Sequence, residues 1–263
     1  MTRRWAHLLL VVGAAGAVLV TMLLFEGTGQ ATTAANPRAR PPDRGHGREL
    51  FLTQCSSCHG VDGKGLTAPG DAVRGPSLLN SGEASAYFYL STGRMPLGAS
   101  NQVPVRKPRA YSQADIDDLV VYVGSLGDGP KVPRVEPSKG DLATGGELFR
   151  SQCAACHSAT GAGGALSYGR AAPSLGQANA TELGSAVIIG PGQMPRFRLS
   201  KHQVDSLARY VDYLHHPDDR GGIALGRLGP IPEGFLVWVV GIGGLLVLAG
   251  WIGAHGTPRR AQR

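Results

Sequence analysis

The hydrophobic residues of this 263-residue chain form two long uncharged runs near its ends and two shorter periodic stripes between them. The end runs, residues 8–25 and 235–252, each span 18 positions without a charged side chain. At about 1.5 Å per residue, such a run gives roughly 27 Å of helix, which approaches the ~30 Å hydrocarbon core of a bilayer. The pattern predicts one transmembrane helix near each end of the chain.

The two internal stripes place apolar side chains at the spacing of a helix, and each follows a serine that can cap a helix N-terminus. We expect each stripe to pack against an earlier helix of its own region, around Phe51 for the first and Phe149 for the second. Tyr122 and Tyr210 are the equivalent aromatic contacts. The stripes consist of Ser112 followed by Ile116, Leu119, Val120, Val123 and Leu126, and of Ser200 followed by Val204, Leu207, Ala208, Val211 and Leu214.

The stripes belong to an internal repeat. Residues 48–55 (RELFLTQC) align with residues 146–153 (GELFRSQC), and residues 75–78 (GPSL) align with residues 172–175 (APSL). The chain therefore contains two copies of one small helical unit. A unit of this size commonly needs a covalent or metal staple in addition to its core.

All four cysteines lie in two copies of the motif Cys-X-X-Cys-His, which is the attachment signature for covalently bound haem. The two-residue gap lets both sulfurs reach the vinyl groups of one porphyrin, and the histidine presents its imidazole to the iron. A zinc site or a thioredoxin-like redox pair is the alternative. However, zinc pairs lie about 15–20 residues apart, whereas these pairs begin 98 positions apart. The residues are Cys55, Cys58 and His59 in the first copy and Cys153, Cys156 and His157 in the second.

A methionine followed by proline stands at a similar distance after each motif. Met95 lies 36 residues after His59, and Met194 lies 37 residues after His157. A thioether opposite the histidine completes six-coordinate iron and suits electron transfer. An isolated methionine also commonly fills gaps in a core, and four histidines are the rival ligands: His46, His202, His215 and His216.

Basic residues beyond the outer ends of both apolar runs predict that both termini are cytoplasmic and that the repeats lie on the other side of the membrane. The first run is alternatively a cleaved signal peptide, because residues 33–35 are small. The net charge of +7 is mainly a signal of this topology, and nucleic-acid binding has no support. The basic residues are Arg3 and Arg4 at one end and Arg259, Arg260 and Arg263 at the other.

These patterns predict eight segments along the chain. They are residues 1–26 as a transmembrane anchor or signal peptide, 27–44 as a linker, 45–127 as the first repeat, 128–144 as a linker, 145–216 as the second repeat, 217–234 as a linker, 235–252 as a transmembrane helix and 253–263 as a cytoplasmic tail. Only the first repeat has an insertion before its last helix, residues 97–109, which is either a solvated loop or a docking loop for a partner.

Two tandem haem motifs together with the C-terminal segment 229–235 (GPIPEGF) resemble the dihaem cytochrome c subunit of the actinobacterial menaquinol-oxidising cytochrome bc complex. The resemblance implies an all-α fold with two tandem class I cytochrome c domains flanked by transmembrane helices, and two covalently bound haems c. It also implies iron ligands and a hydrogen bond from each proximal histidine to a prolyl carbonyl. The matching residues are His59 and His157 as proximal ligands, Met95 and Met194 as distal ligands, and Pro76 and Pro173 as the prolines.

The same resemblance implies the partners and the activity. Members of the family take electrons from the Rieske iron–sulfur subunit, beside a cytochrome b subunit, and pass them to a haem-copper oxidase in a membrane supercomplex. The first domain receives the electrons and the second delivers them. The chain is then the electron-transfer subunit of a quinol–cytochrome c reductase with no catalytic site of its own. A dihaem subunit of another membrane-associated dehydrogenase and a dihaem peroxidase are the alternative functions, although a peroxidase needs an open sixth position on one iron.

Overall fold

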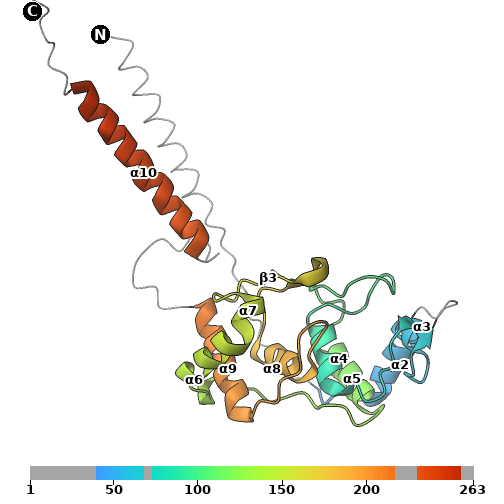
Figure 1. The fold of residues 1–263 in the computed structure, drawn as a ribbon. Coiled ribbons are helices and arrows are strands. Elements are labelled where there is room, and N and C mark those ends of the chain that lie inside the picture. Colours follow the sequence, from blue (N-terminus) through green and yellow to red (C-terminus); the bar gives the residue numbers. More distant parts are fainter. Residues whose placement is uncertain (1–39, 68–72, 217–229, 256–263) are drawn as a thin grey trace, which may run out of the picture. The chain divides into compact units, whose positions relative to one another are not determined.

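The computed structural model describes residues 40–67, 73–216 and 230–255 (Figure 1). Both repeats lie in one unit of the chain, residues 41–263. The predicted N-terminal anchor or signal peptide and the arginine tails at both ends lie outside the described residues.

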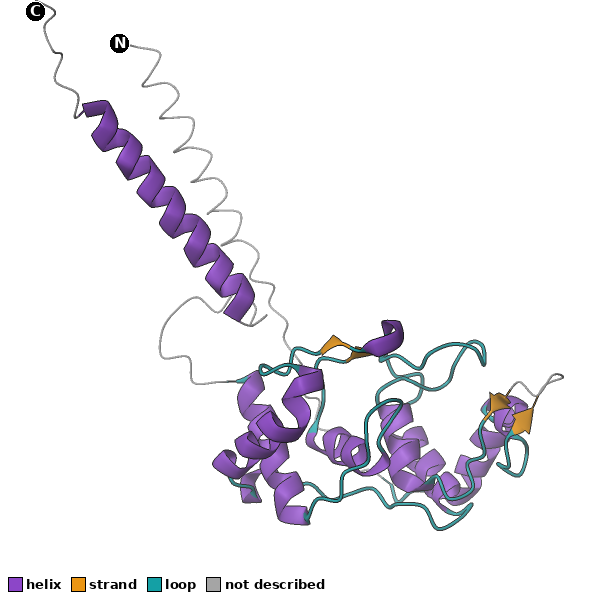
Figure 2. Ribbon diagram, in the orientation of Figure 1, coloured by secondary structure: helices purple, strands orange, loops and turns teal. Residues whose placement is uncertain are grey.

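The described part of the chain is mostly helical, and two short hairpins accompany the helices (Figure 2). The first repeat contains α2 (Arg44–Gln54), α3 (Ser56–His59), β1 (Leu66–Thr67), β2 (Val73–Gly75), α4 (Gly82–Ser91) and α5 (Gln113–Gly124). A 3-10 turn (Pro137–Lys139) lies between the repeats. The second repeat contains α6 (Leu142–Leu148), a π-helical turn (Phe149–Cys153), α7 (Ala154–His157), β3 (Gly164–Ala165), a 3-10 turn (Ser167–Gly169), β4 (Ala171–Ala172), α8 (Ala180–Ile189) and α9 (Lys201–His215), and α10 (Pro230–His255) follows it.

The two repeats have the same core. In the first, α2 packs on α5, and the rings of Phe51 and Tyr122 lie 5.2 Å apart. In the second, α6 packs on α9, and the rings of Phe149 and Tyr210 lie 5.4 Å apart. The helices come this close because a glycine lies at each crossing. A Cβ atom at Gly47 would overlap the backbone of α5, and a Cβ atom at the equivalent Gly145 would overlap the backbone of α9.

The serine caps that the sequence predicts are present in both repeats. Ser112 accepts a hydrogen bond from the backbone N–H of Asp115 at the start of α5. Ser200 and Gln203 form a capping box at the start of α9. The two amphipathic stripes therefore begin and face the core as expected.

Beside its helices, each repeat contains one antiparallel two-stranded hairpin, β1 with β2 and β3 with β4. Strands of two or three residues are too short to produce an alternating pattern. The hairpin of the first repeat lies against the attachment helix: a Cβ atom at Gly75 would approach the carbonyl oxygen of Cys58 to 2.5 Å. The chain after each motif is thus held next to it.

The segment expected as a linker at residues 128–144 is bound to both repeats. The carbonyl of Pro130 accepts a 2.9 Å hydrogen bond from Ala84 in α4, and the N–H of Glu136 donates to Asp205 in α9 at 2.8 Å. The last residues of this segment already belong to α6, which begins at Leu142. The connection is therefore a packed strap between the two repeats and not a free tether.

The repeats contact each other through α4 and α8 (Figure 1). Ala84, Phe88 and Ile189 form a buried apolar cluster at this contact, and each side chain is less than 9% exposed. The two repeats therefore pack against each other.

Helix α10 contains a stretch long and apolar enough to cross a membrane. The stretch, residues 234–254, has 21 residues and a mean hydropathy of 2.3, and none of its most apolar window is buried within the chain. It is the one such helix within residues 40–67, 73–216 and 230–255. The C-terminal apolar run of the sequence is therefore a helix whose apolar side chains face outward.

Candidate haem-binding sites

Each Cys-X-X-Cys-His motif folds as one short helical turn after a longer helix. Cys55 caps α3 and His59 ends it, while Cys153 caps α7 and His157 ends that helix. One helical turn brings the two sulfurs of a motif and its histidine close together. None of the four cysteines, all of which the structure describes, forms a disulfide, so all of them are available for thioether bonds.

The orientation of both histidine rings is fixed in the same way. The Nδ1 atom of His59 donates a hydrogen bond to the carbonyl oxygen of Pro76 at 2.8 Å. The Nδ1 atom of His157 donates to the carbonyl oxygen of Pro173 at 2.9 Å. Because the proton sits on Nδ1, Nε2 is the nitrogen left to bind a metal. Pro76 directly follows β2 and Pro173 directly follows β4, so the hairpins place these prolines beside the histidines.

The first cysteine of each pair has a raised thiol pKa, so its thiol is protonated at neutral pH. Burial raises the pKa of Cys55 to about 11, and the neighbouring Cys58 adds to the effect. Burial and Cys156 raise the pKa of Cys153 to about 11 in the same way. Redox-active Cys-X-X-Cys pairs have lowered thiol pKa values, so this environment argues against the thioredoxin-like alternative.

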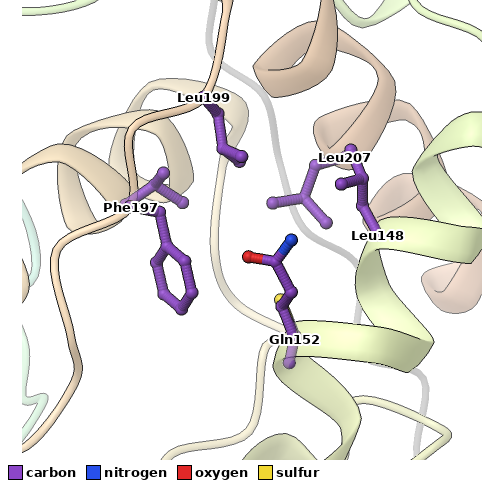
Figure 3. Close-up of a pocket in the computed structure, with 7 residues that line it drawn as sticks. Leu148, Gln152, Phe197, Leu199 and Leu207 are labelled. Atoms are coloured by element: carbon purple, nitrogen blue, oxygen red, sulfur yellow. The ribbon is translucent and has the colours of Figure 1, made fainter.

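An apolar cavity lies beside the second motif (Figure 3). All but two of its lining side chains are aliphatic or aromatic. A porphyrin face requires apolar surroundings of this kind, and the cysteine that would hold the porphyrin is part of the wall. The residues fit a covalently attached haem. The lining residues are Leu148, Gln152, Cys153, Val187, Phe197, Leu199 and Leu207.

Met95 and Met194 occupy equivalent half-buried positions. Met95 packs against the apolar cluster around Phe51, which Cys55 also contacts, and Met194 packs against the cluster around Phe149. Each methionine therefore lies at the same core as the motif of its own repeat. Their role as distal ligands stays a prediction from the sequence.

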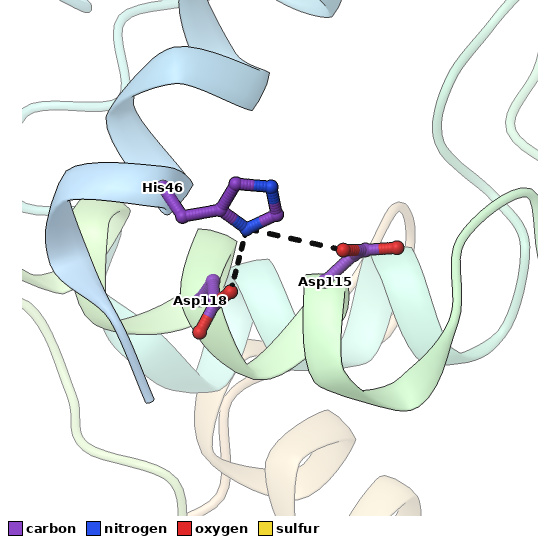
Figure 4. Close-up of side chains that lie close together, drawn as sticks. All are labelled: His46, Asp115 and Asp118. Atoms are coloured by element: carbon purple, nitrogen blue, oxygen red, sulfur yellow. Dashed lines mark hydrogen bonds and ion pairs between the residues drawn. The ribbon is translucent and has the colours of Figure 1, made fainter. Parts of the chain in front are cut away.

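His46, a rival ligand, is held by carboxylates of α5 (Figure 4). Its Nδ1 atom lies 2.8 Å from Asp118 and 3.9 Å from Asp115. Asp118 is only 1% exposed and also accepts a 2.6 Å hydrogen bond from the backbone N–H of Asp43, the cap of α2. This cluster ties α2 to α5 and gives His46 a structural role. Of the other rivals, His202, His215 and His216 all belong to or follow α9, as the sequence places them.

Residues of the insertion at 97–109 bind within the chain. Arg106 donates to Glu182 of α8, with Nη2 and Oε2 2.6 Å apart. Lys107 donates to the carbonyl of Pro96, and Arg109 to the side chain of Gln113, both at 2.8 Å. The loop therefore connects the first repeat with the second, and its three cations are already bound.

The sequence reasoning missed Glu182 and Arg94, which lie where α4 meets α8. Glu182 closes a capping box with Asn179, a four-residue pattern that marks the start of α8 in the sequence. Arg94 precedes Met95, is 9% exposed and lies with its guanidinium 4.8 Å from the centre of the Phe88 ring. Burial, together with the nearby Arg106, lowers the pKa of Arg94.

Two family models match the two repeats separately. Residues 45–127 match the model described as "Cytochrome c". Residues 140–214 match the model described as "Cytochrome C oxidase, cbb3-type, subunit III". Each repeat is thus similar to a cytochrome c domain on its own.

Curated relatives align along nearly the whole chain. The "Cytochrome bc1 complex cytochrome c subunit" of Mycobacterium leprae is 37% identical over 257 residues, which cover 91% of this chain and 87% of that protein. The protein of the same name from Corynebacterium efficiens is 34% identical, with 92% and 89% covered. The solved structure of reduced recombinant cytochrome c4 from Pseudomonas stutzeri is 23% identical, covers 65% of this chain and 97% of its own, and has a TM-score of 0.23.

Several observations indicate the same family. The chain has two cytochrome c domains, and in each a prolyl carbonyl orients the histidine. It also has an apolar C-terminal helix and relatives above 30% identity along nearly its whole length. The chain belongs to the cytochrome c subunits of the cytochrome bc1 complex.

Proposed function

We propose that this chain carries two covalently bound haems c and relays electrons from the Rieske iron–sulfur subunit of a quinol-oxidising cytochrome bc complex to a haem-copper oxidase. The observation that carries the proposal is the duplicated constellation: a Cys-X-X-Cys-His turn whose histidine donates to a prolyl carbonyl at 2.8 Å in one repeat and 2.9 Å in the other. Bound haem supplies reversible one-electron chemistry at its iron. The chain has no catalytic role beyond this transfer.

The chain's own residues hold and tune the cofactors. The cysteines of each motif anchor one porphyrin, and His59 and His157 offer Nε2 as the proximal ligand. Met95 and Met194 offer Sδ as the distal ligand, which raises the potential into a range suited to transfer. Pro76 and Pro173 hold the imidazole rings, and this contact makes the histidine a stronger ligand. The apolar walls exclude water from the metal.

We infer a series order, with the first repeat facing the Rieske subunit and the second facing the oxidase. The direct contact between α4 and α8 supports a short path between the repeats. The similarity of residues 140–214 to an oxidase-associated subunit supports the assignment of the second repeat to the oxidase side. The loop at 97–109 holds the two repeats together, because its Arg106 pairs with Glu182, and this keeps the path between the haems short.

We propose two transmembrane spans, at residues 8–25 and 235–252, with both termini cytoplasmic and the repeats on the outer side. The native cysteines do not interfere with a labelling test, because haem attachment consumes all four. A membrane-impermeant maleimide added to intact cells should label Ser100→Cys, an exposed position of the first repeat, and leave Gln262→Cys unlabelled. Labelling of Gln262→Cys before cell lysis would contradict this topology.

The partner assignment is tested by purifying the complex through an affinity tag on this chain. Cytochrome b, the Rieske subunit and an oxidase should copurify in mild detergent, and quinol should reduce both haems. Removal of the Rieske subunit should abolish this reduction and leave chemical reduction by dithionite intact. Rapid quinol reduction of both haems without the Rieske subunit would show that the electron donor is different.

A further inference from the structure

Arg94 is a buried cation that lacks a complete set of partners. Its side chain is 9% exposed, lies over the ring of Phe88, and has an Nη1 atom without a hydrogen-bond partner among the described residues. The insertion closes over this position: the backbone of Lys107 lies so close to Gly93 that a Cβ atom there would overlap it. Buried polar groups are nearly always paired, and an exception calls for an explanation.

The neighbouring charges do not neutralise Arg94. Arg106 and Glu182 both lie within electrostatic range of it. The Glu182 carboxylate already binds the Arg106 guanidinium at 2.6 Å and the capping N–H of Asn179 at 3.4 Å. Arg94, Arg106 and Glu182 together carry two positive charges and one negative charge. One positive charge is therefore buried without a matching anion, which costs free energy.

The unpaired cation is a property of the first repeat alone. Arg94 directly precedes Met95, and the corresponding residue of the second repeat is the exposed Gln193. In the motif Gly-X-Met-Pro, common to both repeats, a buried arginine therefore stands one residue before one proposed iron ligand and an exposed glutamine one residue before the other. Each haem brings two propionate carboxylates, which are anions matched to a guanidinium.

We propose that Arg94 donates a hydrogen bond from Nη1 to a propionate carboxylate of the haem in the first repeat. The inference rests on the proposed haem attachment, and it makes Arg94 a cofactor-binding residue that the second repeat lacks. A cation held beside the haem stabilises reduced iron relative to oxidised iron. Arg94 therefore sets the first haem at a higher potential than its ligands alone would give.

The test uses the full-length membrane protein with Arg94→Gln, which introduces the residue type of the second repeat. Spectroelectrochemical titration should show about a tenfold shift of the first haem's reduction equilibrium toward the oxidised form, or about 59 mV for one electron. The second haem should shift less than threefold. Arg94→Lys, which keeps the charge, should recover at least half of the effect. Arg109→Gln, which removes an exposed cation of the same loop, should shift neither haem by more than threefold.

Arg94→Met provides a second uncharged variant if Arg94→Gln does not accumulate. Unchanged potentials in either variant would show that the guanidinium does not act on the first haem, and this result would overturn the proposal. An equal shift of both haems, or an equal effect of Arg109→Gln, would also overturn it. Haem staining that still shows two covalent haems distinguishes failure of the Arg94 proposal from failure of the haem assignment. The titration gives the potentials whichever partner donates electrons to the chain.

Discussion

Arg106 of the first repeat and Glu182 of the second form an ion pair with 2.6 Å between Nη2 and Oε2. The Glu182 side chain is 5% exposed and that of Arg106 is 25% exposed, so the pair is shielded from solvent more than a surface ion pair is. The insertion that distinguishes the first repeat from the second is thus a connection between the two. We infer that its main task is to fix the distance between the haem-binding sites.

Arg106→Gln should weaken the joint between the repeats. Loss of a charge-assisted hydrogen bond to a buried carboxylate should cost about 2 kcal/mol of unfolding free energy. Arg109→Gln is the matched control, because the same change is made to an exposed arginine three positions away, and its cost should stay below about 0.5 kcal/mol. Denaturant titration followed by circular dichroism measures both. Equal costs would show that the ion pair contributes nothing specific.

Replacement of Cys55 and Cys58 together by serine should remove one covalent haem and leave the other. The reason is that each motif anchors its own porphyrin. Haem staining after denaturing electrophoresis and the absorbance of the pyridine adduct measure the haem content, which should fall by half. The double replacement at Cys153 and Cys156 is the matched control and should give the same loss. A variant that retains two covalent haems would contradict the assignment of the motif.

Met95→His should lower the potential of the first haem, and Met194→His that of the second. Methionine opposite histidine favours reduced iron, so each change should be on the order of 0.2 V within the ~0.8 V range that axial ligands span. Redox titration and the loss of the sulfur-to-iron charge-transfer band measure the effect. If neither substitution changes the potential or the band, the distal ligands are other residues.

Acid should weaken the strap between the repeats through Glu136. Hydrogen bonds from Lys139 and then Lys201 lower the pKa of its carboxyl from 4.5 to about 2 in the folded chain. Since the folded pKa is the lower one, the stabilisation is fully present above pH 4.5 and is lost as the pH falls toward 2. Glu136→Gln should therefore reduce the pH dependence of the melting temperature between pH 4.5 and 2. Glu147→Gln, at an exposed position of α6, should retain the wild-type slope.

The features whose residues are neighbours or evenly spaced in the sequence were predicted well. The attachment motifs are local, so their cysteines and histidines were identifiable without a fold. The helices α5 and α9 were predictable because each buries one face against one partner, which leaves a clear period in the sequence. The prolines Pro76 and Pro173 came from the resemblance to a family, and the structure shows their carbonyls bound to the expected histidines.

The contact between the repeats was not predictable in the same way. Helix α4 packs on α5 and also on α8, and α8 packs on α9 as well as on α4. Two buried sides leave no single apolar stripe, and this explains why neither helix was identified. Arg94 and Glu182 are two of 45 charged residues, and only the fold shows that they are buried. The hairpins were missed because they contain too few residues for an alternating pattern.

Rapid mixing of quinol with the purified complex tests the central claim, a relay through two haems in series, most directly. In the wild type, stopped-flow spectra should show rapid reduction of both haems. With Met95→His, the second haem should no longer be reduced rapidly, because the first site has fallen below its donor in potential. With Met194→His, the first haem should be reduced at the wild-type rate while oxygen consumption falls. Rapid reduction of the second haem in the Met95→His complex would contradict the series relay.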